Sequence, residues 1–395
     1  MNYKYDVSII IVNYNGKRYI DNLFLSLKEI DIKDIKVQIV FVDNNSSDDS
    51  VKYLKEKYSL ANLKIVESKE NLGFAGGNNL GVKECEGEYI VFLNNDTKVE
   101  KRWLSELFYK IKSDSSIGIV NSKIMFFYDF IKLNAKTLDK FLLKSKILVN
   151  DKEYLIDNKF CKNILYGENI TCFGHSLLYI PLQDGIVDYH IKLYVKDYNE
   201  ETDWIYINDL QYNINKRGII ELNITKEQII QNKLSLIQNA GSGINDNFDG
   251  YDIGLGEEDS EEYQKEYEIN NACGASIIML KSDFEKVGGF DENFFMYYED
   301  TDLSYRIKRL NKRLIFYPNS IVRHIHTGSS KEWSTFFIFH VVRNKVLFVY
   351  KNISKRKAII INLCNLLNKN NTLRKASISA FKIILANLQN KKEKK

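Results

Sequence analysis

The segment EYIVFLNNDTKVE contains a polar turn, Asn94-Asn95-Asp96, directly after an apolar run that is typical of a buried strand. Mg²⁺ and Mn²⁺ prefer hard oxygen ligands, and proteins commonly hold them through one or two carboxylates together with the phosphates of a substrate. Asp96 is therefore a candidate ligand for a divalent cation bound to a diphosphate. The same residues favour turns and helix N-caps for local reasons, so a purely structural role stays open.

A second acidic group, Glu299, Asp300 and Asp302, lies within FMYYEDTDLSYRIKRLNKR, in the first turn of a predicted helix and directly after aromatic residues. Crowded carboxylates beside apolar rings can have a pKa raised toward that of a useful general base. Acidic residues in a first turn also suit the helix macrodipole, and Asp300 could simply cap the helix. The pattern predicts either a catalytic base or a helix start.

Two of the five histidines, His324 and His326, are separated by one residue in RHIH. On a strand this spacing points both side chains to one face. Imidazole is a common ligand for metals such as Mn²⁺, whereas a structural histidine is the alternative.

Two further turns precede predicted helices. Gly73, Gly76 and Gly77 in ENLGFAGGNNLGV would let the backbone approach a phosphate or a ribose closely, although the spacing fits neither a P-loop nor the dinucleotide fingerprint. In VDNNSSDDS, Asp43 stands at the end of a strand and could accept a hydrogen bond from a base N–H. Helix capping explains the later residues of that turn well and Asp43 less well.

The elements that must position these residues alternate between strand and helix. Residues 7–12 and 37–42 are short β-branched runs, and residues 16–29 between them have apolar residues at helical spacing. This alternation continues to about residue 112 and predicts a parallel sheet with helices on both faces. Ligands bind beyond the carboxyl ends of such strands, where Asn13, Asp43 and the 94–96 turn would all lie.

The pattern divides the chain into four parts. Residues 1–128 carry the first α/β pattern, residues 129–235 read as a β-rich insertion, and the α/β pattern returns over residues 236–335. Residues 336–395 form a basic, amphipathic and helical extension. This extension could lie on an anionic membrane surface or be a plain solvated helical tail.

Composition narrows the function classes. The chain of 395 residues has 56 Lys and Arg against 52 Asp and Glu, a net charge of +4, which leaves little electrostatic footprint for nucleic acid. The five cysteines include no C-x-x-C pair, and no apolar run approaches the ~20 residues that span a bilayer or resembles a signal peptide. We expect a cytoplasmic protein, held at the inner face of the cytoplasmic membrane if the tail binds lipid.

Taken together, the motifs resemble the family 2 glycosyltransferases of the GT-A fold, especially the rhamnosyltransferase-like branch that builds bacterial surface polysaccharides. The resemblance rests on VSIIIVNYNG, VDNNSSDDS, ENLGFAGGNNLGV, FLNNDT, the long segment from NNACGAS to RLNKR, and VRHIHTGSS, which occur in the order of the family. The GT-A fold that the resemblance implies has a mixed, mainly parallel sheet flanked by helices. The resemblance covers about residues 5–128 and 236–345. The insertion and most of the extension lie outside it.

The resemblance implies a site for a nucleoside diphosphate sugar, with UDP- or dTDP-sugars favoured. Asp43 would bind the base, and the other donor-binding residues would be Val12, Asn13, Asn71, Gly73 and Asn95. The family's DXD metal motif falls on residues 94–96. This sequence departs from the motif there, because the amide of Asn94 replaces the first carboxylate. Asp96 would then bear most of the Mn²⁺ or Mg²⁺ binding, with Asn94 secondary.

The remaining roles follow from the same resemblance. His324 corresponds to the family's histidine after the last sheet strand and would be the second metal ligand, ahead of His326. Asp300 would be the catalytic base, with Glu299 and Asp302 as competitors.

The implied reaction is metal-dependent single displacement, which inverts the anomeric carbon. The acceptor would be a hydroxyl of a glycan or a lipid-linked sugar, and the missing Q-x-x-R-W motif of processive synthases predicts addition of one or a few sugars. A GT-A-fold scaffold without turnover is the rival interpretation. A nucleotidyltransferase is the other enzyme alternative, although YNGKRYI fits its usual glycine-rich loop poorly.

Overall fold

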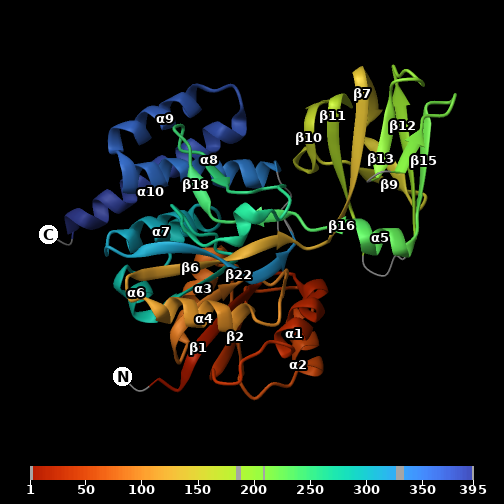
Figure 1. The fold of residues 1–395 in the computed structure, drawn as a ribbon. Helices are drawn as coiled ribbons and strands as arrows, with labels where there is room; N and C mark the ends of the chain where they lie inside the picture. Colours follow the sequence, from red (N-terminus) through yellow and green to blue (C-terminus); the bar gives the residue numbers. More distant parts are fainter. Residues whose placement is uncertain (1–2, 184–187, 208–209, 326–332, 394–395) are drawn as a thin grey trace. The chain divides into compact units, whose positions relative to one another are not determined.

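The computed structural model describes residues 3–183, 188–207, 210–325 and 333–393 (Figure 1). The chain divides into two compact units. Unit 1 contains residues 1–127, 239–253 and 261–395, and unit 2 contains residues 128–238 and 254–260.

Unit 1 is built on a mixed sheet in the order β20-β22-β6-β21-β4-β1-β2-β3, and β5 pairs with β22. Neighbouring strands from β3 to β4 are parallel, β21 is antiparallel to both its neighbours, and β22 is parallel to β6. The predicted mixed, mainly parallel sheet is therefore confirmed. The strands are β1 (Tyr5–Asn13), β2 (Val37–Asp43), β3 (Leu63–Glu67), β4 (Gly87–Leu93), β5 (Thr97–Val99), β6 (Ile117–Phe126), β20 (Tyr267–Glu268), β21 (Ser276–Leu280) and β22 (Arg313–His324).

The side chains of alternate residues of β1 point to opposite faces of the sheet. Val7, Ile9 and Ile11 are buried in one cluster with the helices α1 (Ile20–Lys28), α2 (Ser50–Lys57) and α4 (Trp103–Ser113). On the other face, α3 (Gly73–Lys83) packs against Ile10 and Val12. Helices therefore cover both faces, as the continuous apolar runs of the strands require.

Glycines let α3 lie close to the sheet. A Cβ on Gly77 would be 2.7 Å from Val12, and one on Gly81 would be 2.5 Å from Ile10. Gly76 and Gly77 lie inside the helix rather than in the loop before it. Their place in the fold is explained by packing, which corrects the expectation that they lead into the helix to meet a ligand.

The last strand is longer than the sequence pattern predicts. The apolar run over residues 314–317 predicts a short strand that is followed by a loop before His324. In the structure β22 runs on to His324, with a shift in its register between Tyr317 and Ile321. The irregularity breaks the alternation of side chains, which is why the pattern ended early.

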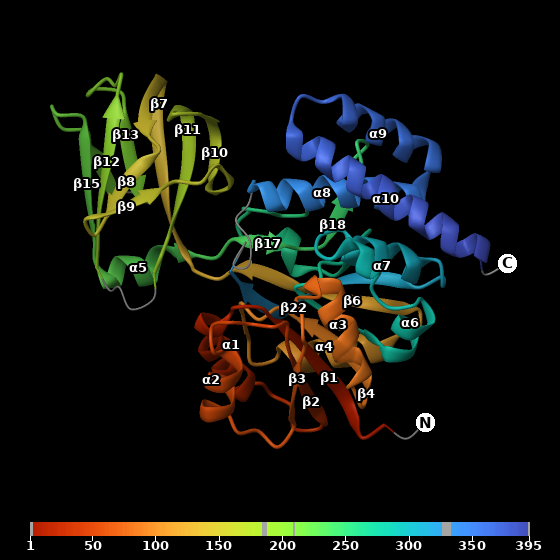
Figure 2. The same ribbon diagram turned by 180° about the vertical axis from the view of Figure 1, so that it is seen from behind.

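The C-terminal part of unit 1 is helical (blue in Figure 1, seen from behind in Figure 2). It follows a short hairpin and two small helices, and its members share a buried cluster with Phe294 and Tyr298. These elements are β17 (Ile237–Asn239), β18 (Ser242–Ile244), β19 (Gly250–Asp252), α6 (Lys281–Lys286), α7 (Glu299–Lys308), α8 (Thr335–Phe348), the π-helical turn η5 (Val349–Ile353), α9 (Lys355–Leu367) and α10 (Asn371–Glu393).

Unit 2 is a β structure with one short helix. Residues of β12 alternate between buried and partly or fully exposed positions, and the buried residues of the strands enclose an apolar core of their own. They are β7 (Phe130–Lys144), β8 (Lys146–Val149), β9 (Lys152–Leu155), β10 (Cys161–Tyr166), β11 (Asn169–Pro181), β12 (Tyr189–Lys196), β13 (Trp204–Ile207), β14 (Leu210–Asn213), β15 (Ile219–Ile224) and β16 (Lys233–Leu234), with α5 (Lys226–Asn232).

Candidate functional site

A cluster of buried polar side chains lies where β1 and β2 end. Asn13 and Asp43 are partners in the parallel register, and Asn13 Nδ2 donates to Asp43 Oδ1 at 3.1 Å. Asn13 Oδ1 accepts from Asn95 Nδ2 at 2.8 Å, and Asp43 Oδ2 accepts from the Ser46 N–H at 2.9 Å. Three predicted donor-binding residues are thus brought together. A carboxylate oxygen has two lone pairs, so Asp43 can still accept a further hydrogen bond.

Gly16 is a residue of this cluster that sequence reasoning missed. A Cβ at Gly16 would lie 2.2 Å from Asn95 Nδ2 and 2.4 Å from Asn13 Oδ1. Only glycine lets the chain after β1 cross so close to these side chains. Its place in VNYNG, directly after the strand, was the available signal.

Asp96 and His324 meet although 228 positions (324 minus 96) separate them in the chain. β5 pairs with β22 so that Thr97 lies opposite His324, and His324 Nε2 is 3.0 Å from Asp96 Oδ1. The Asn94 side-chain amide is 3.1 Å from the same ring nitrogen. The predicted metal-binding turn and the predicted histidine ligand are therefore in contact.

The donor set at this point fits a divalent cation. Asp96 is buried, and its Oδ1 has no hydrogen-bond partner of good geometry, which is costly unless something else binds it. Within the described residues no group of three or more His, Cys, Asp or Glu side chains is arranged to hold a metal. Asp96 and His324 would therefore supply two ligands, and a diphosphate and water would have to supply the others.

Asp300 lies in the first turn of α7, as the sequence predicts. Its Oδ2 accepts from the Gly274 N–H at 3.0 Å, and its Oδ1 accepts from the Thr301 N–H at 2.7 Å. Burial raises the pKa of Asp300, and these hydrogen bonds oppose the rise. Burial and the neighbouring Asp300 charge raise the pKa of Glu299 well above its usual value. The acidic turn is therefore a place where a carboxyl group can accept a proton.

Asp302 differs from Asp300 in its surroundings. It is fully buried and accepts from Arg306 Nε at 2.7 Å, Lys351 Nζ at 2.9 Å and Asn352 Nδ2 at 2.7 Å. Its partners lie on α7 and on the η5 turn. Asp302 thus ties α7 to the C-terminal helices.

The acidic turn and the metal turn are linked through the start of β21. Ser276 pairs with Leu93, the last residue of β4, and the Asn94 N–H donates to the Ala275 carbonyl at 3.0 Å. Gly274, the next residue back, donates to Asp300. Asn94 and the Asp300 carboxylate are therefore hydrogen-bonded to two adjacent residues of the same segment, Ala275 and Gly274.

The aromatic residues before α7 approach the turn that holds Asn71 and Gly73. Asn71 Oδ1 accepts from the Gly73 N–H at 2.9 Å, and the Phe295 carbonyl accepts from the Ala75 N–H at 3.1 Å. Gly73 has a φ of +68°, and a Cβ there would be 2.5 Å from the Phe295 carbonyl oxygen. Gly73 is therefore required for the close approach of these two segments.

Asp252 is a second residue that sequence reasoning missed. Its Oδ1 accepts from Asn239 Nδ2 at 2.6 Å and from Ser242 Oγ at 3.0 Å. Burial raises the pKa of Asp252, the charge on Asp300 adds to the rise, and His324 acts against it. Asp252 thus lies within electrostatic reach of both predicted residues. No motif marked it, because GYD is an ordinary turn sequence.

Two predicted residues remain. His326 lies outside the described residues. Val12 is partly exposed at the end of β1, on the face that carries α3.

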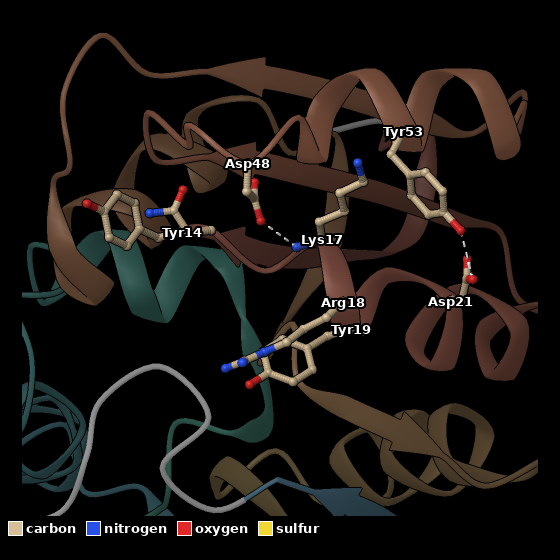
Figure 3. Close-up of a pocket in the computed structure, with 8 residues that line it drawn as sticks. Tyr14, Lys17, Arg18, Tyr19, Asp21, Asp48 and Tyr53 are labelled. Atoms are coloured by element: carbon tan, nitrogen blue, oxygen red, sulfur yellow. Dashed lines mark hydrogen bonds between the residues drawn. The ribbon is translucent and has the colours of Figure 1, made fainter.

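A polar pocket of about 700 Å³ opens beside the Asn13 cluster (Figure 3). Asn15 of its wall is joined to the cluster through Ser46, whose Oγ accepts from both the Asn15 N–H and Asn13 Nδ2. Figure 3 also shows Asp48 accepting from the Lys17 N–H at 2.8 Å. The pocket is lined by Tyr14, Asn15, Lys17, Arg18, Tyr19, Asp21, Asp48 and Tyr53, none of which was a predicted site residue.

Two family models match the chain. Residues 8–179 match the model described as glycosyl transferase family 2, and residues 253–329 match the model described as N-terminal domain of galactosyltransferase. Together these segments include every described residue of the predicted site.

The chain is also similar to curated bacterial proteins. It is 30% identical over 138 residues to a cholesterol galactosyltransferase of Borreliella burgdorferi, which covers 34% of this chain and 37% of the relative. It is 30% identical over 100 residues to the poly(ribitol-phosphate) beta-N-acetylglucosaminyltransferase TarS of Staphylococcus aureus, which covers 25% of this chain and 18% of the relative. The matches therefore span little more than a third of these relatives at most.

The fold is similar to that of GalNAc-T7, whose crystal structure contains UDP, GalNAc and Mn²⁺. The TM-score is 0.51, the sequence identity is 16%, and the match covers 88% of this chain and 48% of the other. At this identity the likeness concerns the fold.

Proposed function

The chain belongs to the family 2 glycosyltransferases of the GT-A fold, and from this premise we propose that it transfers a sugar from a nucleoside diphosphate donor to a hydroxyl group. The observation that carries the proposal is the meeting of Asp96 and His324 beside the Asn13–Asp43 cluster, at one edge of the sheet. In α/β sheets this edge is where ligands bind.

The donor base would be held by Asp43, whose buried carboxylate can accept the N3–H of uracil or thymine. Val12 and Asn13 would wall the base, Asn71 and Gly73 would lie near the ribose, and Asn95 would support Asn13. We favour UDP- or dTDP-sugars, as the resemblance implies, and the N3–H of uracil or thymine can donate to this carboxylate, which is an acceptor only. Guanine also offers N–H donors, so GDP-sugars are tested beside them.

The diphosphate would be held with Mn²⁺ or Mg²⁺ by Asp96 and His324. The cation supplies charge neutralisation for the leaving diphosphate. Asn94 would contribute less, because its amide already contacts His324 Nε2.

Asp300 would remove the proton of the acceptor hydroxyl as it attacks the anomeric carbon. Its raised pKa, with burial as the main cause, supports this role. A single carboxylate gives single displacement, so we propose inversion and transfer of one or a few sugars. The acceptor would be a glycan or a lipid-linked sugar of a bacterial surface polysaccharide. The rhamnosyltransferase-like branch stays a prediction.

A screen of UDP-, dTDP- and GDP-sugars by thermal shift with Mn²⁺ would identify the donor. Mn²⁺-dependent hydrolysis of that donor then separates an enzyme from a scaffold without turnover, since a scaffold would bind the donor and leave it intact.

The metal assignment has a sharper test. We expect Asp96→Ala to abolish metal-dependent donor binding, because it removes the one carboxylate of the turn, whereas Asn94→Ala should leave measurable binding. Calorimetry with the donor nucleotide and Mn²⁺ measures both. Undiminished affinity in Asp96→Ala would contradict the assignment.

A further inference from the structure

Helices α9 and α10 each expose a row of large apolar residues, although Ile361, Ile383 and Ile384 of the same helices pack partly buried against the core. On α9, Ile359, Leu363 and Leu367 are 52%, 53% and 86% exposed, while Ala358 is fully buried. Their spacing of four residues places them in one row along the helix. A helix that only packs on its own protein would point its larger apolar residues inward.

Helix α10 repeats this arrangement. Its exposed row consists of Ile378, Phe381, Leu385 and Leu388, which are between 41% and 52% exposed. Ala376 and Ala380 are fully buried on the opposite side, where α10 packs against α8 and α9. We call these two rows the apolar stripes of α9 and α10.

The charge of this region is one-sided. Residues 354–392 contain no Asp or Glu, whereas Lys355, Arg356, Lys357, Lys369, Arg374, Lys375 and Lys382 are cationic and exposed. The rest of the chain has the opposite balance, because the whole chain has a net charge of +4 and residues 354–392 carry nine cationic residues, which leaves −5 for the remainder. Cations that flank an exposed apolar row are typical of helices that lie in the headgroup region of an anionic membrane.

We propose that the apolar stripes of α9 and α10 dock unit 1 onto an anionic lipid surface. Charge complementarity selects this occupant, because a cationic rim around an apolar row matches acidic headgroups above acyl chains. Among the described residues no helix is long and apolar enough to span a membrane, so the contact is peripheral. The inference deepens the proposed function, on which it rests for the lipid-linked acceptor.

The experiment is co-sedimentation of the full chain with vesicles of equal parts phosphatidylglycerol and phosphatidylcholine, and with phosphatidylcholine alone. We expect binding to the anionic vesicles, weakened by salt, and little binding to the neutral ones. Phe381→Ser with Leu385→Ser should weaken binding by at least about 10-fold. Leu25→Ser with Leu138→Ser is the matched control, because both leucines are exposed but lie outside the stripes, and it should bind as wild type does.

A second pair of variants, matched in the charge that they remove, tests the contribution of the cationic residues to vesicle binding. Arg374→Gln with Lys375→Gln should weaken vesicle binding roughly 30-fold, since each cation near such a surface contributes about one kcal/mol. Lys216→Gln with Arg217→Gln removes the same charges from an exposed turn of unit 2 and should have no such effect.

Three results would overturn the proposal: no vesicle binding, equal binding to both vesicle types, or equal binding by the stripe variant. A wild-type dimer that becomes monomeric in the stripe variant would show that a second copy covers the stripes instead. Calorimetry of donor and Mn²⁺ without vesicles is independent of these outcomes, so a failure of lipid binding is distinguishable from a failure of the proposed activity.

Discussion

Asp300 and Asp302 stand two residues apart in α7 but have different partners, which leads to a prediction at the scale of single residues. Asp300 accepts only backbone N–H groups and, at longer range, the Thr301 hydroxyl. Asp300→Asn should keep donor and metal binding, because the amide preserves the shape of the side chain. Mn²⁺-dependent donor hydrolysis or transfer should fall by about 10² to 10⁴, the range attributed to general bases.

Asp302→Asn is the matched control for this prediction. It weakens a buried carboxylate's bonds to two cations, Arg306 and Lys351, so it should lower the melting temperature; breaking such a pair costs about 3 to 5 kcal/mol. The rate per folded molecule should change little. A large rate defect in folded Asp302→Asn, or a near-normal rate in Asp300→Asn, would contradict the assignment of the base.

Glu299 offers a prediction about pH. Its Oε2 is buried without a partner, and its folded-state pKa is raised, mainly by burial. A carboxyl group with a raised folded pKa stabilises the protein below its unfolded pKa and loses this contribution as the pH rises through the folded pKa. Glu299→Gln should therefore be more stable than wild type at neutral pH, by about 1.4 kcal/mol for each unit of pKa difference.

Denaturant unfolding at a series of pH values from about 4 to about 8 measures this difference in stability. It should be small at the acidic end and grow with pH. Glu200→Gln, at an exposed position, is the control and should show no such trend. A constant difference across the series would mean that Glu299 does not titrate as proposed.

At the scale of elements, α8 holds the aromatic turn before α7. Phe295, Tyr297 and Tyr298 have φ values of 62°, 71° and 69°, a left-handed conformation that costs of order 1 to 3 kcal/mol per residue and persists only under external constraint. Asn344 of α8 supplies such a constraint, because its Nδ2 lies 2.7 to 2.8 Å from the carbonyl oxygens of residues 294, 296 and 297. Arg343 adds a second donor to the Phe294 carbonyl.

We therefore expect Asn344→Asp to lower both stability and the rate of transfer. The substitution replaces donors with a carboxylate that faces three carbonyl oxygens, and Asp300 follows this turn directly. Loss of the buried bonds should cost about 1 to 3 kcal/mol. Melting temperature and donor hydrolysis measure the effect, and Asn387→Asp, at an exposed position on α10, controls for the added charge. If Asn344→Asp has wild-type stability and activity, the conformation of the aromatic turn does not depend on hydrogen bonds from Asn344.

At the scale of the whole molecule, every described residue of the proposed site belongs to unit 1. The chain enters unit 2 twice, and the longer of the two segments, residues 128–238, begins and ends at one place, because Phe130 pairs with Leu234 and Ser235 Oγ donates to Asp129 Oδ1 at 2.7 Å. A short Gly-Ser linker can therefore replace residues 130–234. We expect this variant to bind donor and Mn²⁺ within about threefold of wild type by calorimetry, a difference below 1 kcal/mol.

Circular dichroism shows whether the shortened chain folds, and it should lose β signal while retaining its helices. A folded variant without donor binding would mean that unit 2 contributes to the donor site. The separate roles of residues 129–235 and 336–395 stay predictions until such variants are measured.

The sequence by itself determined the alternation of strands and helices in the first half of the chain and the ends of its first strands. Residues 7–12 and 37–42 are continuous β-branched runs, and buried parallel strands need such runs. Polar turns follow the strands, so Asp43 at the end of β2 and Asp96 after β4 could be chosen as candidate site residues by position alone. These signals are local, because both the apolar period and the turn chemistry are written in consecutive residues.

Tertiary structure alone decided which of these residues meet. Asp96 contacts His324 because β5 pairs with β22, and this long-range register is not written in either segment alone. Asp302 is distinguished from Asp300 by Lys351, which comes from a distant turn, and Asp252 approaches Asp300 from an unmarked hairpin. Long-range pairing and burial set these contacts, and neither leaves a periodic trace in the sequence.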